Sequence, residues 1–228
     1  YMAEHYFNHP NYLKIEGKPV LFVYLTRVLS RNGTLGEVVG AMRASAAQAG
    51  QELYIIGDEV FGQPPNSSNA LGLLDAVTNY DVYGSMGVKG YAGQYAVDRY
   101  YRAQAQWRAL AHEAGAAFVP AATPGFNDKG VRGGHEATSR KLDSDAEYGS
   151  LFRAMLEQAV AHTDDPTGNM LLITSWNEWH EDTQIEPIAE APPTASDDSD
   201  SGKAFSEGLS YEGYGERYLQ ILREVVAR

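Results

Sequence analysis

Short continuous apolar runs alternate along the chain with longer stretches in which apolar residues recur at helical spacing. Five of the short runs are rich in β-branched and aromatic residues, which is typical of buried strands. These runs are residues 20–24, 53–56, 76–83, 117–120 and 170–174. Strands separated by helices need long crossovers and therefore pair in parallel, so the pattern predicts an α/β fold.

The longer stretches predict helices, two of them behind Ser/Thr-x-x-Glu capping boxes. The boxes are residues 34–37 and 144–147. We expect helices from residue 34 to Gly50, around 100–111 with an end at Gly115, from 144 to 159, and over 214–226.

About five strand–helix units fit into this pattern, whereas a closed (β/α)₈ barrel needs eight strands and typically ~250 residues. The 228 residues allow one large domain or two small ones. On the pattern alone, a doubly wound sheet is the alternative to a barrel.

Two segments predict long loops, residues 64–69 and residues 189–208. The second contains the acidic run Ser196-Asp197-Asp198-Ser199-Asp200. Carboxylates are ligands for Ca²⁺, but the run lacks the glycine and terminal glutamate spacing of a calcium loop. We therefore interpret residues 189–208 as a solvated, flexible acidic loop and expect no metal site.

Composition excludes several classes of function. The net charge of −12, with only 18 Lys and Arg residues, argues against binding to nucleic acid or to an anionic membrane surface. The absence of cysteine excludes thiolate metal sites and cysteine nucleophiles. The sequence contains no run of about 18 apolar residues, so it predicts no membrane span. The residues around Tyr1 do not read as a signal peptide, so the compartment stays open, including an extracytoplasmic one if a leader was removed.

The segment from Thr174 to Pro187 carries the most chemistry. It begins where an apolar strand ends, and in parallel α/β folds the loops after the strands form the active site. Cleavage of a glycosidic bond requires one carboxyl group to protonate the leaving oxygen and a second to act from another side of the sugar. Glu178 and Glu181 are three positions apart and are our candidate catalytic pair, with an expected separation of roughly 5 to 7 Å.

The neighbours of these carboxylates suit a sugar. Trp176 and Trp179 offer flat faces for a pyranose, while Asn177 and His180 can donate hydrogen bonds to hydroxyl groups. The competing interpretation is a buried aromatic turn whose glutamates only meet solvent or backbone. An exposed pair of tryptophans is costly unless something covers or binds it, which favours a sugar site.

The run from Ile173 to Glu181, continued by Thr183-Gln184-Ile185-Glu186, resembles the signature of glycoside hydrolase family 99, which includes endo-α-1,2-mannosidases. Two further segments are similar to that family. They are His9–Leu13 with Gly17–Val20, and Pro124–Asp128 with Arg132.

The resemblance implies a (β/α)₈ barrel and a retaining endo-acting hydrolase for α-mannosidic linkages in a glycan or polysaccharide, without a cofactor. It makes Glu178 the base toward the sugar's 2-hydroxyl, which attacks the anomeric carbon, and Glu181 the acid and then base. The substrate-binding residues we expect are Trp176, Asn177, Trp179, His180, Tyr83, Phe126, Asp128, Arg132 and Glu186.

Three features depart from the family pattern. Phe126 stands where a tyrosine is usual, Asp182 follows Glu181 where a glycine is usual, and no barrel strand is found before Tyr1. We therefore expect residues 1–228 to form a single partial barrel domain that lacks about the first three strand–helix units.

Some polar residues outside the motif have two interpretations. Asp58 and Glu59 follow the second strand and either hold sugar hydroxyls or cap a helix. Tyr80 and Tyr83 end the third strand and either line the pocket or pack in the core. His135, between glycines and Glu136, indicates a mobile lid.

Two other functions stay open. One is a protein associated with glycosyl transfer in surface-polysaccharide biosynthesis, although no Gly-rich phosphate-binding turn or basic cluster is present. The other is a carbohydrate-binding remnant without catalysis, favoured by Phe126 and by the missing strands.

Overall fold

The computed structural model describes residues 1–65 and 70–227. The chain folds into two compact units. Unit 1 contains Tyr1–Tyr80, Ala103–Pro120 and His162–Met170, and unit 2 contains Asp81–Arg102, Ala121–Ala161 and Leu171–Arg228. None of the described helices is long and apolar enough to cross a membrane.

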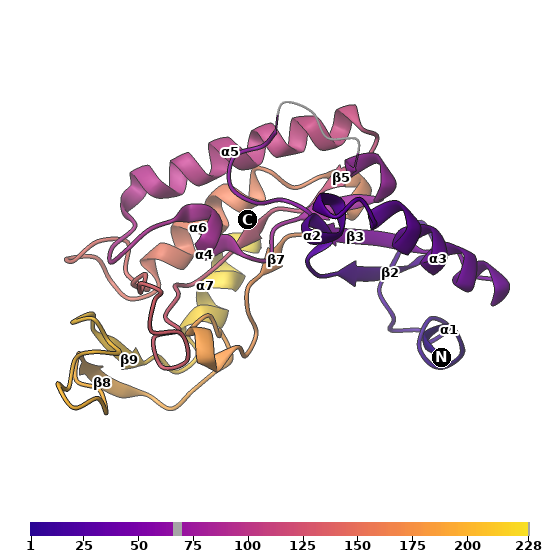
Figure 1. The fold of residues 1–228 in the computed structure, drawn as a ribbon. Helices are drawn as coiled ribbons and strands as arrows, with labels where there is room; N and C mark the ends of the chain where they lie inside the picture. The colour runs from indigo at the N-terminus through magenta and orange to yellow at the C-terminus, as the bar shows by residue number, and fades with distance from the viewer. Residues whose placement is uncertain (66–69, 228) are drawn as a thin grey trace. The chain divides into compact units, whose positions relative to one another are not determined.

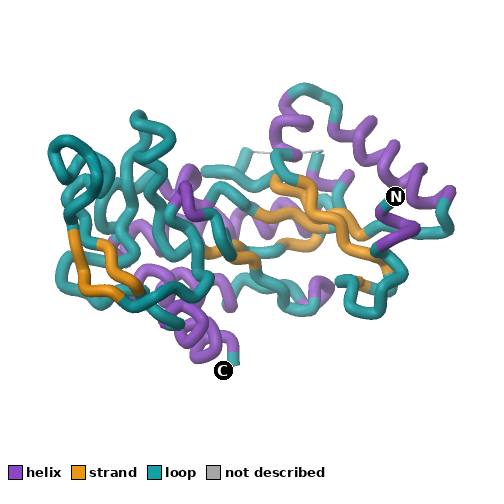
Figure 2. Tube along the Cα trace, turned by 90° about the horizontal axis from the view of Figure 1, so that it is seen from below, coloured by secondary structure: helices purple, strands orange, loops and turns teal. Residues whose placement is uncertain are grey.

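Unit 1 is built on a five-stranded sheet of order β1-β2-β3-β4-β5 (Figures 1 and 2). The strands are β1 (Lys14–Ile15), β2 (Lys18–Val23), β3 (Tyr54–Asp58), β4 (Ala76–Thr78) and β5 (Ala117–Phe118). β1 pairs antiparallel with β2, and the remaining neighbours are parallel, as the alternating pattern predicts. The register places Val20 opposite Tyr54, Ile56 opposite Ala76 and Val77 opposite Phe118.

Helices connect and cover these strands. They are α1 (Met2–His5), α2 (Thr26–Arg31), α3 (Leu35–Gln48), the 3₁₀ turns η1 (Leu71–Leu73) and η2 (Asp165–Thr167), and the second half of α5 (Gly93–Glu113). Leu35 of α3, Ile55 of β3 and Trp107 of α5 meet in one apolar core. The burial of Tyr100, Gln104, Trp107 and Ala111 confirms the predicted inward face of α5.

Unit 2 carries the first half of α5 with α4 (Val82–Met86), α6 (Ser150–Val160) and α7 (Arg217–Val226). Its strands are β6 (Ala121–Ala122), parallel to β7 (Leu172–Ile173), and the antiparallel pair β8 (Ala191–Thr194) and β9 (Tyr211–Gly213). Helices α6 and α7 lie side by side, with the rings of Phe152 and Tyr218 5.6 Å apart (Figure 1). A single core joins these helices to β6 and to Tyr101 of α5.

The predicted run at 117–120 is interrupted. β5 ends at Phe118 and β6 begins at Ala121, so Val119 and Pro120 separate two short ladders. Pro120 has no amide hydrogen and cannot donate to a ladder, which explains why the pairing breaks there. The five predicted runs correspond along the chain to β2, β3, β4, the interrupted pair β5 and β6, and β7. The run at 76–83 is only partly a strand, because β4 ends at Thr78 and α4 begins at Val82.

Both predicted capping boxes are wrong. Thr34 does occupy the N-cap of α3, but its side chain makes no capping bond, because its hydroxyl donates to the carbonyl of Leu29. Helix α6 begins at Ser150 behind Gly149, six residues after Ser144. Gly149 has φ 82, a conformation that glycine adopts without strain.

The two predicted loops have different outcomes. Residues 66–69 of the first lie outside the described residues. In the second, β8 occupies Ala191–Thr194, and Asp197 accepts backbone hydrogen bonds from Ser199, Phe205 and Ser206. The acidic segment is thus folded around one of its own carboxylates, and its flexibility stays a prediction.

Candidate active site

The segment that carries Glu178 and Glu181 is a closed turn that follows β7 in unit 2. The amide of Ser175 donates to the carbonyl of Thr183 at 2.8 Å, and the amide of Ile185 donates back to Ser175 at 3.2 Å. The Ser175 hydroxyl accepts from the amide of Glu178 at 2.8 Å and also contacts the Thr183 hydroxyl at 2.8 Å. These bonds hold residues 175–185 as one closed turn at the carboxyl end of β7.

Glu178 begins the 3₁₀ turn η3 (Trp179–Glu181) as its N-cap. Its Oε1 accepts from the amide of His180 at 3.2 Å and lies 3.4 Å from His180 Nδ1. The Glu178 side chain is 40% exposed and that of His180 is more exposed. Glu178 is therefore accessible to a substrate while its own turn holds it in place.

Glu181 ends the same turn, and a chain of charged groups holds its carboxylate. Arg132 Nη1 lies 2.9 Å from Glu181 Oε1 and 2.8 Å from Asp128 Oδ2. The amide of Asn127 also donates to the carbonyl of Glu181 at 2.8 Å. The loop after β6 therefore bonds both the side chain and the backbone carbonyl of Glu181.

Asp182 follows Glu181 with φ 49, a conformation common for glycine and rare for other residues. Its carboxylate accepts from the buried guanidinium of Arg140, with Nη2 2.9 Å from Oδ1. Burial alone would lower the pKa of Arg140, but the Asp182 carboxylate outweighs burial and raises it. The negative charge expected from the sequence beside Glu181 is therefore paired with Arg140.

The two tryptophans lie on the surface of this turn. Trp176 is 51% exposed and Trp179 is 49% exposed. Asn177 is also exposed, whereas Glu186 is half-buried and its carbonyl accepts from the Tyr214 hydroxyl at 2.8 Å. The structure does not support the interpretation as a buried aromatic turn, because the indole rings of both tryptophans remain accessible.

Tyr83 and Phe126 form a stacked pair with ring centroids 3.7 Å apart and planes 6° apart. Phe126 is 6% exposed, and the Tyr83 hydroxyl donates to the carbonyl of Glu136 at 2.7 Å. Tyr83 thus covers one face of the ring of Phe126, a residue that the resemblance assigns to substrate binding. Direct contact of Phe126 with a sugar stays a prediction.

The loop containing Phe126 is packed closely at its start. A Cβ on Gly125 would lie 2.8 Å from Cγ of Arg140. Real side chains do not tolerate this distance, so Gly125 is needed where the Arg140 stem passes. Phe126 and Thr138 exchange two backbone hydrogen bonds, at 3.0 and 2.7 Å, which close the loop at its base.

Unit 2 thus contains the candidate catalytic pair and every substrate-binding residue that the resemblance to family 99 implies. Asp58 and Glu59, the other candidates for holding sugar hydroxyls, belong to unit 1. There Asp58 accepts from the amides of Leu25 and Tyr80 and pairs with Arg27, so it ties loops together and caps no helix. Sequence reasoning missed Arg140 altogether.

It also missed the role of His135, which is bonded to Asp128 at 2.8 Å. The spacing of Asp128, Arg132 and His135 at i, i+4 and i+7 is a signal that could have found this group, since such residues share one face of a helical turn. Among the described residues, no three or more His, Asp or Glu side chains are placed to hold a metal ion.

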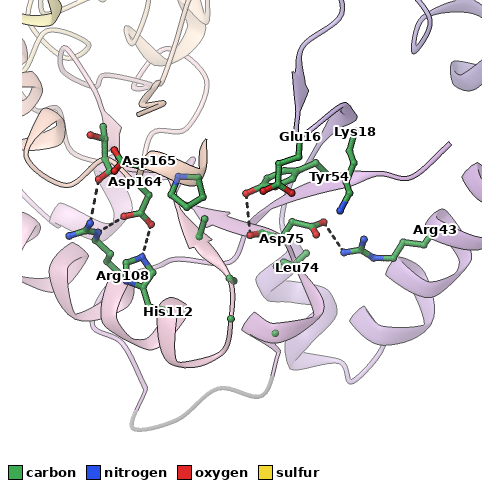
Figure 3. Close-up of a pocket in the computed structure, with 16 residues that line it drawn as sticks. Glu16, Lys18, Arg43, Tyr54, Leu74, Asp75, Arg108, His112, Asp164 and Asp165 are labelled. Carbon is green, nitrogen blue, oxygen red and sulfur yellow. Dashed lines mark hydrogen bonds and ion pairs between the residues drawn. The ribbon is translucent and has the colours of Figure 1, made fainter. Parts of the chain in front are cut away.

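Unit 1 contains a separate cavity of about 780 Å³ (Figure 3). It is lined at the amino-terminal ends of strands by Lys18, Tyr54 and Ala117. Its carboxylates are paired, Asp75 with Arg43 and Asp164 with Arg108 and His112. Barrel chemistry takes place at the carboxyl ends of strands, so we interpret these pairs as structural.

The closed turn and its carboxylates can be compared with known proteins. A family model described as Glycosyltransferase WbsX matches residues 1–192. A zebrafish (Danio rerio) protein called glycoprotein endo-alpha-1,2-mannosidase-like protein is 38% identical over 69 residues, which are 30% of this chain and 14% of that protein.

Solved structures also match the chain. A glycoside hydrolase-like protein has a TM-score of 0.67 and 25% identity, over 97% of this chain and 57% of its own. The family 99 endo-α-mannosidase of Bacteroides thetaiotaomicron bound to bis-tris-propane has a TM-score of 0.61 and 20% identity, over 99% of this chain and 63% of its own. A second structure of that enzyme has a TM-score of 0.57 and 19% identity, over 100% of this chain and 61% of its own.

These matches confirm the predicted fold class, an α/β chain that corresponds to part of a (β/α)₈ barrel. The chain spans about three-fifths of the length of the solved structures it resembles. They also confirm the resemblance to glycoside hydrolase family 99 that the motif around Glu178 and Glu181 indicates. Because the family model matches residues 1–192 of the 228, the chain belongs to the family described as Glycosyltransferase WbsX.

Proposed function

We propose that this chain carries the catalytic carboxylates of a retaining, endo-acting glycoside hydrolase that cleaves α-mannosidic linkages in a glycan or polysaccharide. The observation that carries the proposal is the closed turn after β7, which presents Glu178, Glu181 and two half-exposed tryptophans within six residues. The names of the zebrafish relative and of the Bacteroides enzymes support the sugar class.

In the proposed reaction, Glu178 takes the proton of the sugar's 2-hydroxyl, and that oxygen attacks the anomeric carbon. The bond to the leaving oxygen breaks as Glu181 gives this oxygen a proton. Glu181, now a carboxylate, takes a proton from water, whose oxygen opens the 1,2-anhydro ring while Glu178 returns its proton to O2. Two inversions at the anomeric carbon give net retention.

The contacts of the two carboxylates support these roles. Glu178 lies in the turn between the exposed tryptophans, where a sugar ring can reach it. Arg132 holds Oε1 of Glu181, and the second oxygen of that carboxylate takes no part in this bond. A catalytic acid fixed through one oxygen can use the other for proton transfer.

Separate Glu178→Gln and Glu181→Gln variants test the proposal. Each should lower kcat on an α-mannosyl oligosaccharide about a thousandfold or more while sugar binding is kept. On an α-mannosyl fluoride, whose leaving group needs no proton, the loss in Glu181→Gln should be much smaller in the first step. NMR of the first product should show the α-anomer.

Glu190→Gln is the matched control, because Glu190 is an exposed glutamate nine positions after Glu181. Its rate should equal that of the unmodified chain. Equal rates for Glu190→Gln and the two site variants would contradict the assignment, and so would a β-anomer as first product.

A second candidate is transfer of the sugar to an acceptor in surface-polysaccharide biosynthesis, favoured by the description of the matching family. Both site arginines are already paired with carboxylates, Arg132 with Asp128 and Glu181, and Arg140 with Asp182. That pairing disfavours the phosphate of a nucleotide donor. Adding an acceptor sugar to the same assay separates transfer from hydrolysis, and binding without any turnover would indicate a carbohydrate-binding remnant.

A further inference from the structure

His135 is part of the charged chain that reaches Glu181. The amide of Arg132 donates to the carbonyl of Asp128 at 2.8 Å, and the amide of His135 donates to Arg132 at 3.1 Å. These two consecutive turns place the side chains of Asp128, Arg132 and His135 on one side of the loop. Asp128 is 1% exposed and lies beneath the other two.

Both side chains bond the same atom. Asp128 Oδ2 lies 2.8 Å from Arg132 Nη1 and 2.8 Å from His135 Nδ1, while the buried Oδ1 has no hydrogen-bond partner among the described residues. A carboxylate accepts hydrogen bonds and does not donate them, so this contact assigns the Nδ1–H tautomer to His135. The other ring nitrogen, Nε2, is left to bond a different group.

The surroundings of the imidazole favour a ligand. Its side chain is 48% exposed, and its ring centroid lies 6.3 Å from those of both Tyr83 and Phe126. The ring is therefore held on one edge by Asp128 and flanked by an aromatic pair. Because the bond to Asp128 fixes the proton on Nδ1, the Nε2 of this exposed ring can accept a hydrogen bond from a hydroxyl group.

We propose that His135 is a substrate-contacting residue, whose Nε2 bonds a hydroxyl of the sugar on the leaving side of the cleaved linkage. This inference rests on the proposed function. The side follows from connectivity, because His135 and Arg132 share Asp128, and Arg132 holds Glu181, the residue that protonates the leaving oxygen. His135 then selects substrates whose leaving group is a sugar with a correctly placed hydroxyl.

Three donors with the same α-mannosyl group test the idea: an oligosaccharide, an aryl glycoside with a poor leaving group, and the fluoride. Only the first has a leaving-side sugar. For His135→Ala, kcat/KM on the oligosaccharide should fall about three- to tenfold, the effect of one lost hydrogen bond, and stay within about twofold on the other two. An equal loss on the aryl glycoside would show that His135 acts only through Glu181, and would overturn the proposal.

Two conservative variants separate bracing of Asp128 from contact with sugar. His135→Asn places an amide near the position of Nδ1 and retains the bond to Asp128, whereas His135→Gln places its amide near the position of Nε2. A sugar contact predicts that the Asn variant is as impaired on the oligosaccharide as the Ala variant, and that the Gln variant recovers part of the rate. The opposite order would overturn the proposal.

A binding measurement distinguishes failure of this inference from failure of the proposed function. In the Glu178→Gln chain, titration with the oligosaccharide should shift the NMR signal of His135 Nε2 and leave that of His162, in unit 1, unchanged. If the unmodified chain turns over none of the donors, the proposed hydrolase function fails, and this titration still decides whether His135 meets the sugar. Turnover without a shift would overturn the His135 proposal alone.

Discussion

The buried Arg140 forms an ion pair with the partly buried Asp182, directly beside the proposed acid Glu181. Arg140 Nη2 lies 2.9 Å from both Oδ1 and the carbonyl oxygen of Asp182, and the guanidinium also bonds the carbonyl of Gln184 at 3.0 Å. It lies over the rings of Tyr214 and Tyr218, at 5.1 and 4.8 Å. One cation thus fixes the chain immediately after Glu181 against the core of unit 2.

Replacing Arg140 by Met should therefore both destabilise unit 2 and displace Glu181. Removing Arg140 leaves the charge of Asp182 uncompensated, and because the Asp182 side chain is 19% exposed the cost should be about 3 kcal/mol, the low end for buried pairs. Urea unfolding measures this loss. Arg153→Met is the control, since Arg153 pairs with Glu224 at the surface and should cost at most about 1 kcal/mol. Adding Asp182→Gly to Arg140→Met should recover part of the stability, because it removes the orphaned charge at a backbone position that suits glycine.

Arg132→Met should reduce activity without unfolding the chain. The Arg132 side chain is more than half exposed, but its partner Asp128 is buried and would keep only His135, so the free energy of unfolding should fall by about 1–2 kcal/mol. Loss of its bond to Glu181 should lower kcat about 10- to 100-fold, with KM less affected. Arg132→Lys should restore part of the rate, because it keeps the charge but not the geometry of the guanidinium. A large fall in stability without a fall in kcat would contradict this role.

The stack of Tyr83 on Phe126 predicts a graded loss of stability. Tyr83→Phe keeps the stack and loses the hydroxyl bond to Glu136, at a cost of about 0.5–1.5 kcal/mol. Tyr83→Ala also removes the aromatic pair, worth about 0.5–1.5 kcal/mol beyond the area it buries, and uncovers Phe126. Urea unfolding of both variants checks the order, with the exposed Tyr95→Phe as a neutral control.

Asp164 in unit 1 should make stability depend on pH. Burial alone would raise its pKa, but hydrogen bonds from His112 and Arg108 outweigh burial and lower the pKa below its ordinary value of 3.8. A lowered pKa in the folded state contributes stability above pH 3.8 and loses it as the pH falls through the folded value. Asp164→Asn should thus be less stable than the unmodified chain at neutral pH, and the difference should shrink on acidification.

Urea titrations across this pH range measure the effect. Asp165→Asn changes the adjacent, exposed aspartate and should match the unmodified chain at every pH. A constant difference between Asp164→Asn and the unmodified chain from neutral to acid pH would show that the charge of Asp164 is not responsible.

Trp176→Ala and Trp179→Ala should weaken sugar binding without affecting folding. Both side chains are about half exposed, so little packing is lost. Each should raise the Kd for an α-mannosyl oligosaccharide about tenfold, measured by calorimetry in the Glu178→Gln chain so that no substrate is consumed. Tyr91→Ala, an exposed aromatic elsewhere in unit 2, serves as the control and should leave the Kd unchanged.

The α/β class, the parallel pairing and the position of the candidate catalytic segment after β7 could be predicted from the sequence. Apolar runs such as 53–56 and the helical face of Tyr100, Gln104, Trp107 and Ala111 are local patterns, and each reports directly on burial. The motif around Glu178 and Glu181 also lies within a few consecutive residues. Its resemblance to a known family could therefore be read without coordinates.

Only the tertiary structure decided how the carboxylates are held. Arg132 is 49 positions from Glu181, and Arg140 is 42 positions from Asp182. Neither pairing leaves a periodic trace in the sequence, because contacts between distant loops depend on how helices and strands bring them together. The predicted capping box at Thr34 is wrong for a related reason. The Thr34 hydroxyl donates to the carbonyl of Leu29, and the local sequence pattern does not reveal this competing acceptor. Local periodicity thus determined which elements form, and long-range packing determined which charges meet.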